Sequence, residues 1–254
     1  MNSQLVVLGA GLLGGAMNAL AGGGSFITLP ALISVGVPSV LANSSNTVGL
    51  YPGTAASAWA YREGLTPVGG VPLRVMTLVT LIGGAAGAFL LLRTSTRLFD
   101  FLLPWLLLVA TLMLTFGRRL GEALRRRWHI RPGVLLLLQF ALGIYGGYFG
   151  GAVGIMMVAV WGLIDGRDLK SMNAPRTLAN TAANTAAVVI FIMARAVRWR
   201  ETLLLLIGAT VGGYGGAQLG RRAPAWAIRA GTLAIAFGMT VVFFVRAYFE
   251  GAAR

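Results

Sequence analysis

The chain has 254 residues, of which 57% are hydrophobic and only 11% charged, and its mean hydropathy is +0.78. Soluble domains carry about 25% charged residues, so this composition excludes a single soluble core and predicts an integral membrane protein. The net charge of +14 could suit nucleic acid, but the arginines lie in short loops between apolar runs, as the positive-inside rule predicts for a membrane protein. Cysteine is absent and histidine occurs once, which excludes a disulfide framework and a thiolate metal site.

The first predicted element, residues 4–37, is an apolar segment interrupted by glycine. Residues 9–37 read GAGLLGGAMNALAGGGSFITLPALISVGV, with three consecutive glycines at positions 22–24. Glycine costs about 1 kcal/mol per residue in a helix interior, so we predict a break here. Broken helices at membrane depth line protein cavities, and their freed N-termini bind anions.

Further along the chain, the pattern predicts two similar units and no separate soluble domain. The first unit, 4–116, continues with helices at 43–61, 70–92 and 98–116, of which the last is bulky and expected to face lipid. A basic linker follows at 117–131. The second unit, 132–249, has a broken segment at 132–165 and helices at 175–195, 201–220 and 224–249. The prediction is therefore an all-α polytopic membrane protein with one transmembrane domain over residues 1–254.

Three signals indicate an internal repeat, which is the usual build of secondary transporters. Both units start with a glycine-broken segment. Both continue with a similar motif, LANSSNT at 41–47 and LANTAANT at 178–185. Both third helices are rich in glycine, which predicts close helix packing. The glycines four residues apart are Gly83 and Gly87 in the first unit and Gly208, Gly212, Gly216 and Gly220 in the second.

The topology depends on what the broken segments do. Each exceeds 30 residues, or roughly 50 Å of helix, which is too long for one upright span of about 30 Å. We favour a hairpin that turns at the glycines, which makes the two repeats inverted. Fourteen of the 21 basic residues then share the linker's side, placing the linker in the cytoplasm and both termini outside. The alternative is a single crossing by each segment, with eight spans, parallel repeats and a split of 13 to 8.

A polar cluster follows each broken segment and supplies the candidate substrate site. Asn43, Asn46 and Thr47 share one helical face, and so do Asn180 and Asn184. Amides and hydroxyls in a bilayer need partners, so the alternative reading is hydrogen bonding between helices. As an anion site, the set would combine side-chain donors with backbone N–H groups at the breaks. The substrate-binding candidates are Asn43, Ser44, Asn46, Thr47, Asn180, Thr181, Asn184, Thr185, Gly23, Gly24, Ser25, Gly151 and Arg176.

Charge is scarce around this site. Arg176 is the nearest fixed positive charge, and it either guides an anion inward or anchors the chain at the cytoplasmic surface. The seven acidic residues lie in loops or near the ends of predicted spans, which argues against a proton relay through a carboxylate. Four aromatic residues could line the path, but for each of them we favour a lipid-interface or packing role: Tyr51, Trp59, Tyr145 and Tyr148.

Two nucleotide motifs fail. Residues 6–15, VVLGAGLLGG, match GxGxxG, but no acidic residue follows at the distance that a dinucleotide's ribose requires, since the first acid is Glu63. Lys170, the only lysine, is not preceded by the glycine of a phosphate-binding loop. We expect no cofactor and no metal.

At these residues the chain resembles the sulfite exporter TauE/SafE family. The resemblance rests on the two halves, on the three glycines followed by Pro30, and on GGYFGGAVG at 146–154. It implies a bacterial inner-membrane permease for sulfite, sulfonates or other small organosulfur anions. It also implies that the two polar clusters form the site. The second half departs from three consecutive glycines, so the two halves need not play equal roles.

The residues leave several functions to weigh. The leading hypothesis is a secondary transporter of small oxyanions that works by alternating access, and a passive anion channel could use the same pocket. An enzyme is disfavoured because the chain offers no acid–base or metal apparatus. A scaffold that transports nothing would bind no ligand. The expected partners are a small anion and the lipid bilayer, and the sequence permits a homodimer.

Overall fold

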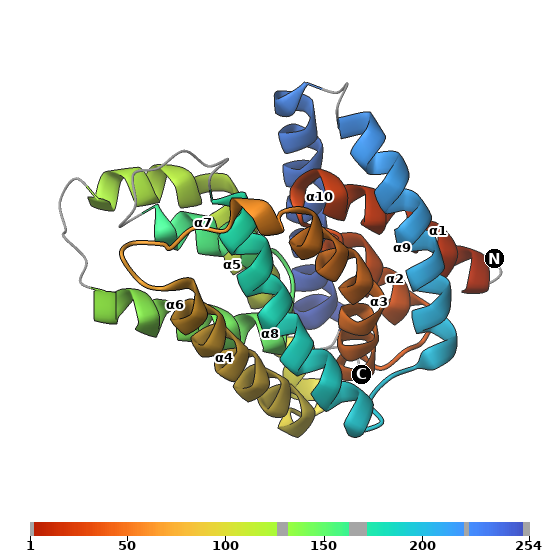
Figure 1. The fold of residues 1–254 in the computed structure, drawn as a ribbon. Coiled ribbons are helices and arrows are strands. Elements are labelled where there is room, and N and C mark those ends of the chain that lie inside the picture. The colour runs from red at the N-terminus through yellow and green to blue at the C-terminus, as the bar shows by residue number, and fades with distance from the viewer. Residues whose placement is uncertain (1–2, 126–131, 163–171, 221–223, 251–254) are drawn as a thin grey trace.

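The computed structural model describes residues 3–125, 132–162, 172–220 and 224–250 (Figure 1). Residues 126–131 of the expected linker and 163–165 of the second broken segment lie outside these ranges. The described ranges contain ten α-helices and no β-strand, which confirms the all-α prediction. The helices are α1 Ser3–Ala21, α2 Ser25–Ser34, α3 Ser39–Ala60, α4 Leu73–Arg93, α5 Thr96–Arg125, α6 Pro132–Tyr148, α7 Val153–Trp161, α8 Asn173–Met193, α9 Trp199–Gly220 and α10 Ala225–Val245, with short helical turns at Arg62–Gly64 and Arg246–Glu250.

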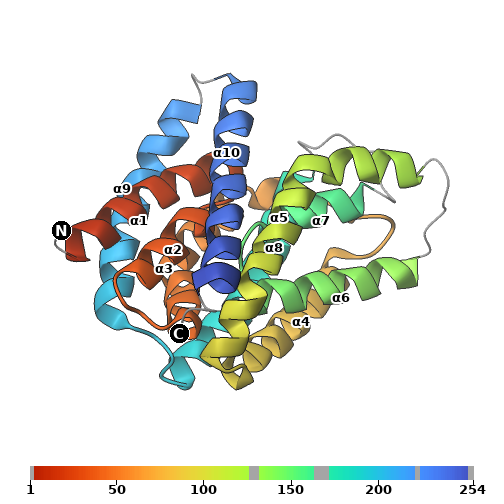
Figure 2. The same cartoon turned by 180° about the vertical axis from the view of Figure 1, so that it is seen from behind.

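Both expected interruptions are present. The first separates α1 from α2 at Gly22, whose φ of +76° only glycine adopts without strain. The second separates α6 from α7, with Gly150 at φ +77° and Ala152 at φ 58°. After each break the shorter helix turns back and contacts the longer one, so α1–α2 and α6–α7 are helical hairpins (Figures 1 and 2). The orientation of these hairpins in a bilayer stays a prediction.

The largest departure from the predicted helix bounds is in α5, while α3 begins four residues and α9 two residues earlier than expected. The prediction ended α5 at residue 116, where the apolar run stops, but the helix continues to Arg125. The change from apolar to polar residues marks the edge of the membrane and not the end of the helix, because Leu, Arg, Glu and Ala are all good helix formers. The expectation that this helix faces lipid holds for one side only. Phe101 and Trp105 are half exposed, whereas Phe99, Leu103 and Leu107 are fully buried.

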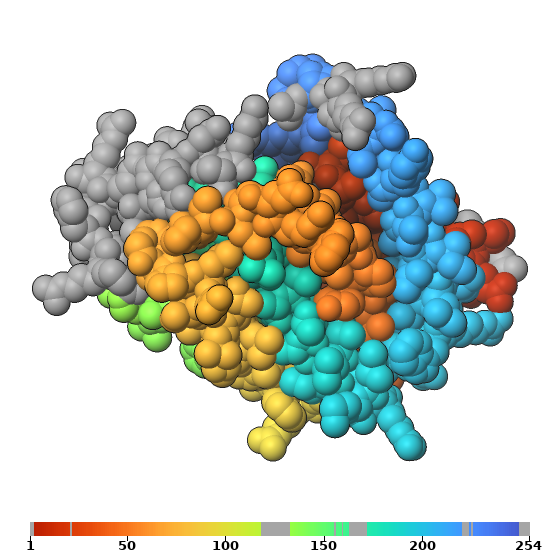
Figure 3. Space-filling view, viewed as in Figure 1, coloured from red at the N-terminus to blue at the C-terminus, as the bar shows by residue number. Residues whose placement is uncertain are grey.

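The two units pack into each other. The first helix of each unit lies against the fourth helix of the other, α1 on α9 and α6 on α4. The short second helix of each unit contacts the fifth helix of the other, α2 on α10 and α7 on α5. The two third helices, α3 and α8, contact each other at the centre. Figure 3 shows α3 and α8 side by side on one face, between α4 and α9. Exchanging the two units therefore reproduces these pairings, and a site between α3 and α8 draws on both units.

Glycine permits these crossings. A methyl group on Gly212 of α9 would lie 1.9 Å from the Leu12 carbonyl oxygen of α1, and one on Gly87 of α4 would lie 2.1 Å from the Ile144 oxygen of α6. Both distances are shorter than any van der Waals contact, so the two backbones touch where no side chain fits. The glycine spacing thus correctly predicted close packing between membrane helices.

Five of the described helices are long and apolar enough to cross a bilayer, namely α1, α4, α5, α9 and α10. The central helices α3 and α8 have 22 and 21 residues, but their polar side chains exclude them from this group. A protein with several such helices, whose outer surface exposes large apolar side chains, is a multi-pass membrane protein.

Candidate functional site

The first half of α3 is buried on every side. Residues 42–50 are all buried, although five of them in succession, from Asn43 to Thr47, are polar. The side chains of Asn43, Ser44 and Ser45 have no exposed surface, and Asn46 is 1% exposed. Polar groups in a bilayer require protein partners, and here α2, α5, α8 and α9 contact α3.

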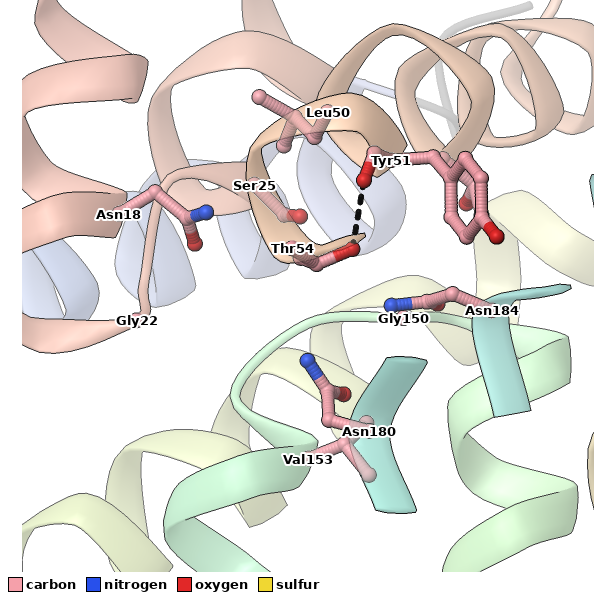
Figure 4. Close-up of a pocket in the computed structure, with 11 residues that line it drawn as sticks. Asn18, Gly22, Ser25, Leu50, Tyr51, Thr54, Gly150, Val153, Asn180 and Asn184 are labelled. Carbon is pink, nitrogen blue, oxygen red and sulfur yellow. Dashed lines mark hydrogen bonds between the residues drawn. The ribbon is translucent and has the colours of Figure 1, made fainter. Parts of the chain in front are cut away.

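A small cavity lies where both helix breaks approach α3 and α8 (Figure 4). Its volume, measured as the space open to the centre of a water molecule, is about 30 Å³. A single water needs roughly 10–15 Å³ on the same measure, so a compact solute or a few waters fit. The wall is formed by Asn18, Gly22, Ser25, Thr47, Leu50, Tyr51 and Thr54 of the first unit and Gly150, Val153, Asn180 and Asn184 of the second. The structure therefore brings four expected residues, Ser25, Thr47, Asn180 and Asn184, together from both units.

Three carboxamides on the cavity wall lack partners. In the part of the chain that the structure describes, the side chains of Asn18, Asn180 and Asn184 make no hydrogen bond. Figure 4 shows those of Asn18 and Asn180 pointing into the same space from α1 and α8. Each amide offers two N–H donors and one acceptor. The cavity is thus rich in neutral donors that a ligand can engage.

The chain at Gly150 runs between the two units. A methyl group there would lie 3.4 Å from Thr47 Oγ1 and 4.0 Å from Asn184 Oδ1. In addition, α2 begins at Ser25 and α7 begins at Val153, and both residues line the cavity. The first N–H groups of a helix have no partner within the helix and carry partial positive charge. Two half-helices therefore direct their positive ends toward one space.

Asn46 supports this wall from behind. Its Nδ2 donates to Ser25 Oγ at 3.1 Å, and its Oδ1 accepts from the hydroxyl of Thr28. Thr28 also donates to the Gly24 carbonyl oxygen at 3.1 Å. These bonds fix the start of α2 against α3 and hold Ser25 at the cavity.

Asn43 plays the matching part for the second break. Its Nδ2 donates to the carbonyl oxygen of Tyr148, the last residue of α6, at 2.8 Å. Thr47, one turn further along α3, donates to the Asn43 carbonyl oxygen at 2.9 Å. Asn43 itself does not line the cavity.

Several expected residues lie outside the cavity wall. Ser44 donates to the Ala196 carbonyl oxygen in the turn between α8 and α9. Thr181 donates to the Thr54 carbonyl oxygen at 3.1 Å, and Thr185 bonds the Tyr51 hydroxyl at 2.9 Å, so both join α8 to α3. Three more are glycines of the breaks, Gly23, Gly24 and Gly151, where an added methyl would collide with neighbouring atoms.

Arg176 lies beside the second break. Its side chain packs on Gly154 in the first turn of α7, where a methyl group would lie 3.5 Å from the arginine Cγ and Cδ. The residue is half-buried, and among the described residues its guanidinium has neither a hydrogen bond nor an ion pair. Within the described ranges, then, a positive charge without an acidic partner lies next to the helix end that lines the cavity.

Comparison with known proteins identifies the family. Residues 7–243 match the family described as "Sulfite exporter TauE/SafE". The chain belongs to the TauE/SafE sulfite exporter family. It is 27% identical to a "Probable membrane transporter protein" of Haemophilus influenzae over 91% of this chain and 90% of the relative. It is 26% identical to "Probable membrane transporter protein YfcA" of Escherichia coli K12 over 82% of this chain and 77% of the relative. No solved structure matches the chain.

This TauE/SafE chain is therefore a membrane transporter, and its cavity includes residues that the sequence analysis did not select. Asn18, Thr54 and Gly150 line it, and so do the apolar side chains of Leu50 and Val153. Asn18 could have been found from the sequence, because it is the one strongly polar residue between Gln4 and the first glycine break. Leu50 and Val153 carry no such signal, since an apolar residue in a membrane helix is the ordinary case.

Proposed function

We propose that the protein is a secondary transporter that moves small organosulfur oxyanions, such as sulfite or short sulfonates, across the bacterial inner membrane by alternating access. The observation that carries the proposal is the shared cavity, with the positive ends of α2 and α7 and with amides from α1 and α8 that have no partner in the described part of the chain. Neutral donors hold an anion while leaving its release inexpensive, since no buried opposite charge must be separated from it.

The side chains divide into three roles in this proposal. Asn18, Asn180 and Asn184 replace the water around the anion's oxygens. Arg176, next to the start of α7, attracts the anion before it enters. Leu50 and Val153 form an apolar part of the wall that accommodates the organic group of a short sulfonate. The volume of about 30 Å³ favours compact solutes over larger ones.

Alternating access requires contacts that open on one side at a time. Two bonds join α3 to α8 beside the cavity, Tyr51 with Thr185 at 2.9 Å and Thr181 with the Thr54 oxygen at 3.1 Å. The two helices belong to different units, so a rocking motion of one unit against the other breaks these bonds. Their interhelical bonds are weak enough, typically about 0.6 kcal/mol in membranes, to open during a transport cycle.

The test is ligand binding followed by flux. Purified protein is screened with sulfite, sulfate, thiosulfate and short sulfonates, and the bound anion is expected to raise the unfolding temperature. The anion that does so is then followed in proteoliposomes with a sulfur-35 label. Stabilisation by none of these anions would overturn the proposed substrate class.

A passive anion channel is the second candidate, because the same cavity could conduct. Preloading the vesicles with unlabelled substrate separates the two functions. A transporter exchanges one substrate for another, so labelled uptake rises with the preload. A channel gives no such stimulation.

A further inference from the structure

Two buried oxygen atoms on α3 have no hydrogen-bond partner within the described residues, Ser39 Oγ and Asn43 Oδ1. Ser39 is 3% exposed and Asn43 has no exposed surface. Four residues apart on one helix, they lie on the same face, one turn from each other. More than nine-tenths of buried polar groups are paired in proteins, so two neighbouring exceptions indicate that an ordered water or an ion lies against them.

The surroundings favour a cation over an anion. The Asn43 amide adjoins the carbonyl oxygen of Tyr148 at the end of α6, where Nδ2 donates at 2.8 Å. The last carbonyl groups of a helix have no partner within the helix and carry partial negative charge. Together these groups present a hydroxyl oxygen, an amide oxygen and a helix C-terminus. Ser39 is also the first residue of α3, so a cation must lie on the side of its hydroxyl away from the free N–H groups at that helix start.

The charge of the ion follows from the ligand atoms. No carboxylate is buried anywhere in the described ranges, so these ligands are all neutral. Divalent Ca²⁺ and Mg²⁺ bind through one or more carboxylates, which this site lacks. Unwound carbonyls and half-helix C-termini of this kind coordinate Na⁺ in other membrane transporters.

We propose that Ser39 Oγ and Asn43 Oδ1, with the C-terminal carbonyl groups of α6, form a Na⁺ site behind the anion cavity. Its role as a coupling site rests on the proposed transport function. Thr47 connects the two sites, because it donates to the Asn43 carbonyl oxygen at 2.9 Å and also lines the cavity. An anion and a cation so placed attract each other, and each raises the affinity for the other by the same factor, which we expect to be on the order of tenfold.

The first experiment needs no anion substrate. Unfolding of the purified protein is followed in NaCl, KCl and choline chloride at equal chloride concentration and ionic strength. Na⁺ is expected to raise the unfolding temperature in a saturable way, by several degrees once its concentration is well above Kd. Identical curves in the three salts would show that an ordered water joins the two oxygens, and an equal effect of K⁺ would exclude Na⁺ as the specific ligand. Either result overturns the proposal.

Variants then locate the effect. Ser39→Ala removes one ligand atom and is expected to raise the Kd for Na⁺, read from the thermal shift, at least tenfold. Ser39→Thr keeps the hydroxyl and is expected to keep the Na⁺ response. Ser57→Ala, the same substitution at an exposed position of the same helix, is the control. A Na⁺ response that is unchanged in Ser39→Ala would place the ion elsewhere and overturn the assignment. Should Ser39→Ala fail to fold, the comparison of the three salts on the unaltered chain still tests whether the protein binds Na⁺ specifically.

The outcome is separable from that of the proposed function. If neither unfolding nor anion flux depends on Na⁺, the cation site is overturned and the proposed anion transport remains supported. Stabilisation by Na⁺ that is lost in Ser39→Ala, without flux of any oxyanion, would leave the cation site and overturn the proposed substrate.

Discussion

The asparagines of α3 and α8 come from nearly the same sequence motif and take different positions. In α3, Asn43 is bonded to the end of α6 and Asn46 to the start of α2, so each joins this helix to one of the two breaks. In α8, the side chains of Asn180 and Asn184 face the cavity and have no partner in the described part of the chain. The asparagines of α3 are thus structural amides that bond the two helix breaks, whereas those of α8 are free amides that a ligand can engage.

The largest effect is expected from removing the two free amides. The double variant Asn180→Ala/Asn184→Ala should reduce oxyanion flux about a hundredfold, since each lost hydrogen bond to a charged group costs about 1.5 kcal/mol and tenfold in rate or affinity. Its unfolding temperature should change little, because neither amide has a hydrogen-bond partner to lose among the described residues. Flux is measured in proteoliposomes at equal folded protein, with Asn173→Ala in the first turn of α8 as the control. Full flux in the double variant would show that the asparagines of α8 do not contribute to the binding site.

The bonded amides of α3 should respond in the opposite way. Asn46→Ala deletes the bonds to Ser25 and Thr28 and leaves two buried hydroxyls with fewer partners. We expect a loss of about 1–2 kcal/mol in the free energy of unfolding, from two interhelical bonds within a membrane protein. Thermal unfolding in detergent measures it. If Asn46→Ala were as stable as the unaltered chain, the distinction between the structural amides of α3 and the free amides of α8 would be wrong.

A smaller effect is expected where α3 meets α8. Tyr51→Phe removes the hydroxyl that bonds Thr185 at 2.9 Å and should lower the free energy of unfolding by about 0.6 kcal/mol. The matched control is Tyr214→Phe, because that tyrosine is 72% exposed on α9. An equal shift in both variants would mean that the α3–α8 bond contributes nothing of its own.

The two breaks offer the finest comparison. Gly22→Ala and Gly150→Ala place the same methyl group at nearly the same backbone angle, φ +76° and +77°, so both should lose about 1–2 kcal/mol of stability. Only the methyl on Gly150 meets the cavity residues Thr47 and Asn184, whereas nothing lies within 4 Å of the one on Gly22. Gly150→Ala should therefore weaken anion binding a further few-fold, as read from the concentration dependence of the thermal shift. Equal affinities would place the anion away from Gly150.

The sequence predicted the breaks and the polar helices because these follow from local chemistry. Glycine clusters interrupt helices wherever they occur, and asparagine in an apolar run needs a partner wherever it occurs. The sequence could not distinguish the structural amides from the free ones, because the partners of Asn43 and Asn46 come from other helices, α6 and α2. The length of α5 was also missed, because polarity reports the membrane boundary and not the hydrogen bonding of the backbone.

The crossing of α1 with α9 has a consequence for biosynthesis. The glycine-lined surface of α1 finds its partner only when Trp199–Gly220 has been made, nearly two hundred residues later. At typical translation speeds of about 5–20 residues per second, the first hairpin waits roughly 10–40 s after its own synthesis. During that interval the glycine-lined surface of α1 must be covered by lipid or by the insertion machinery. Truncation before α9 should therefore leave an early intermediate that quality-control proteases degrade.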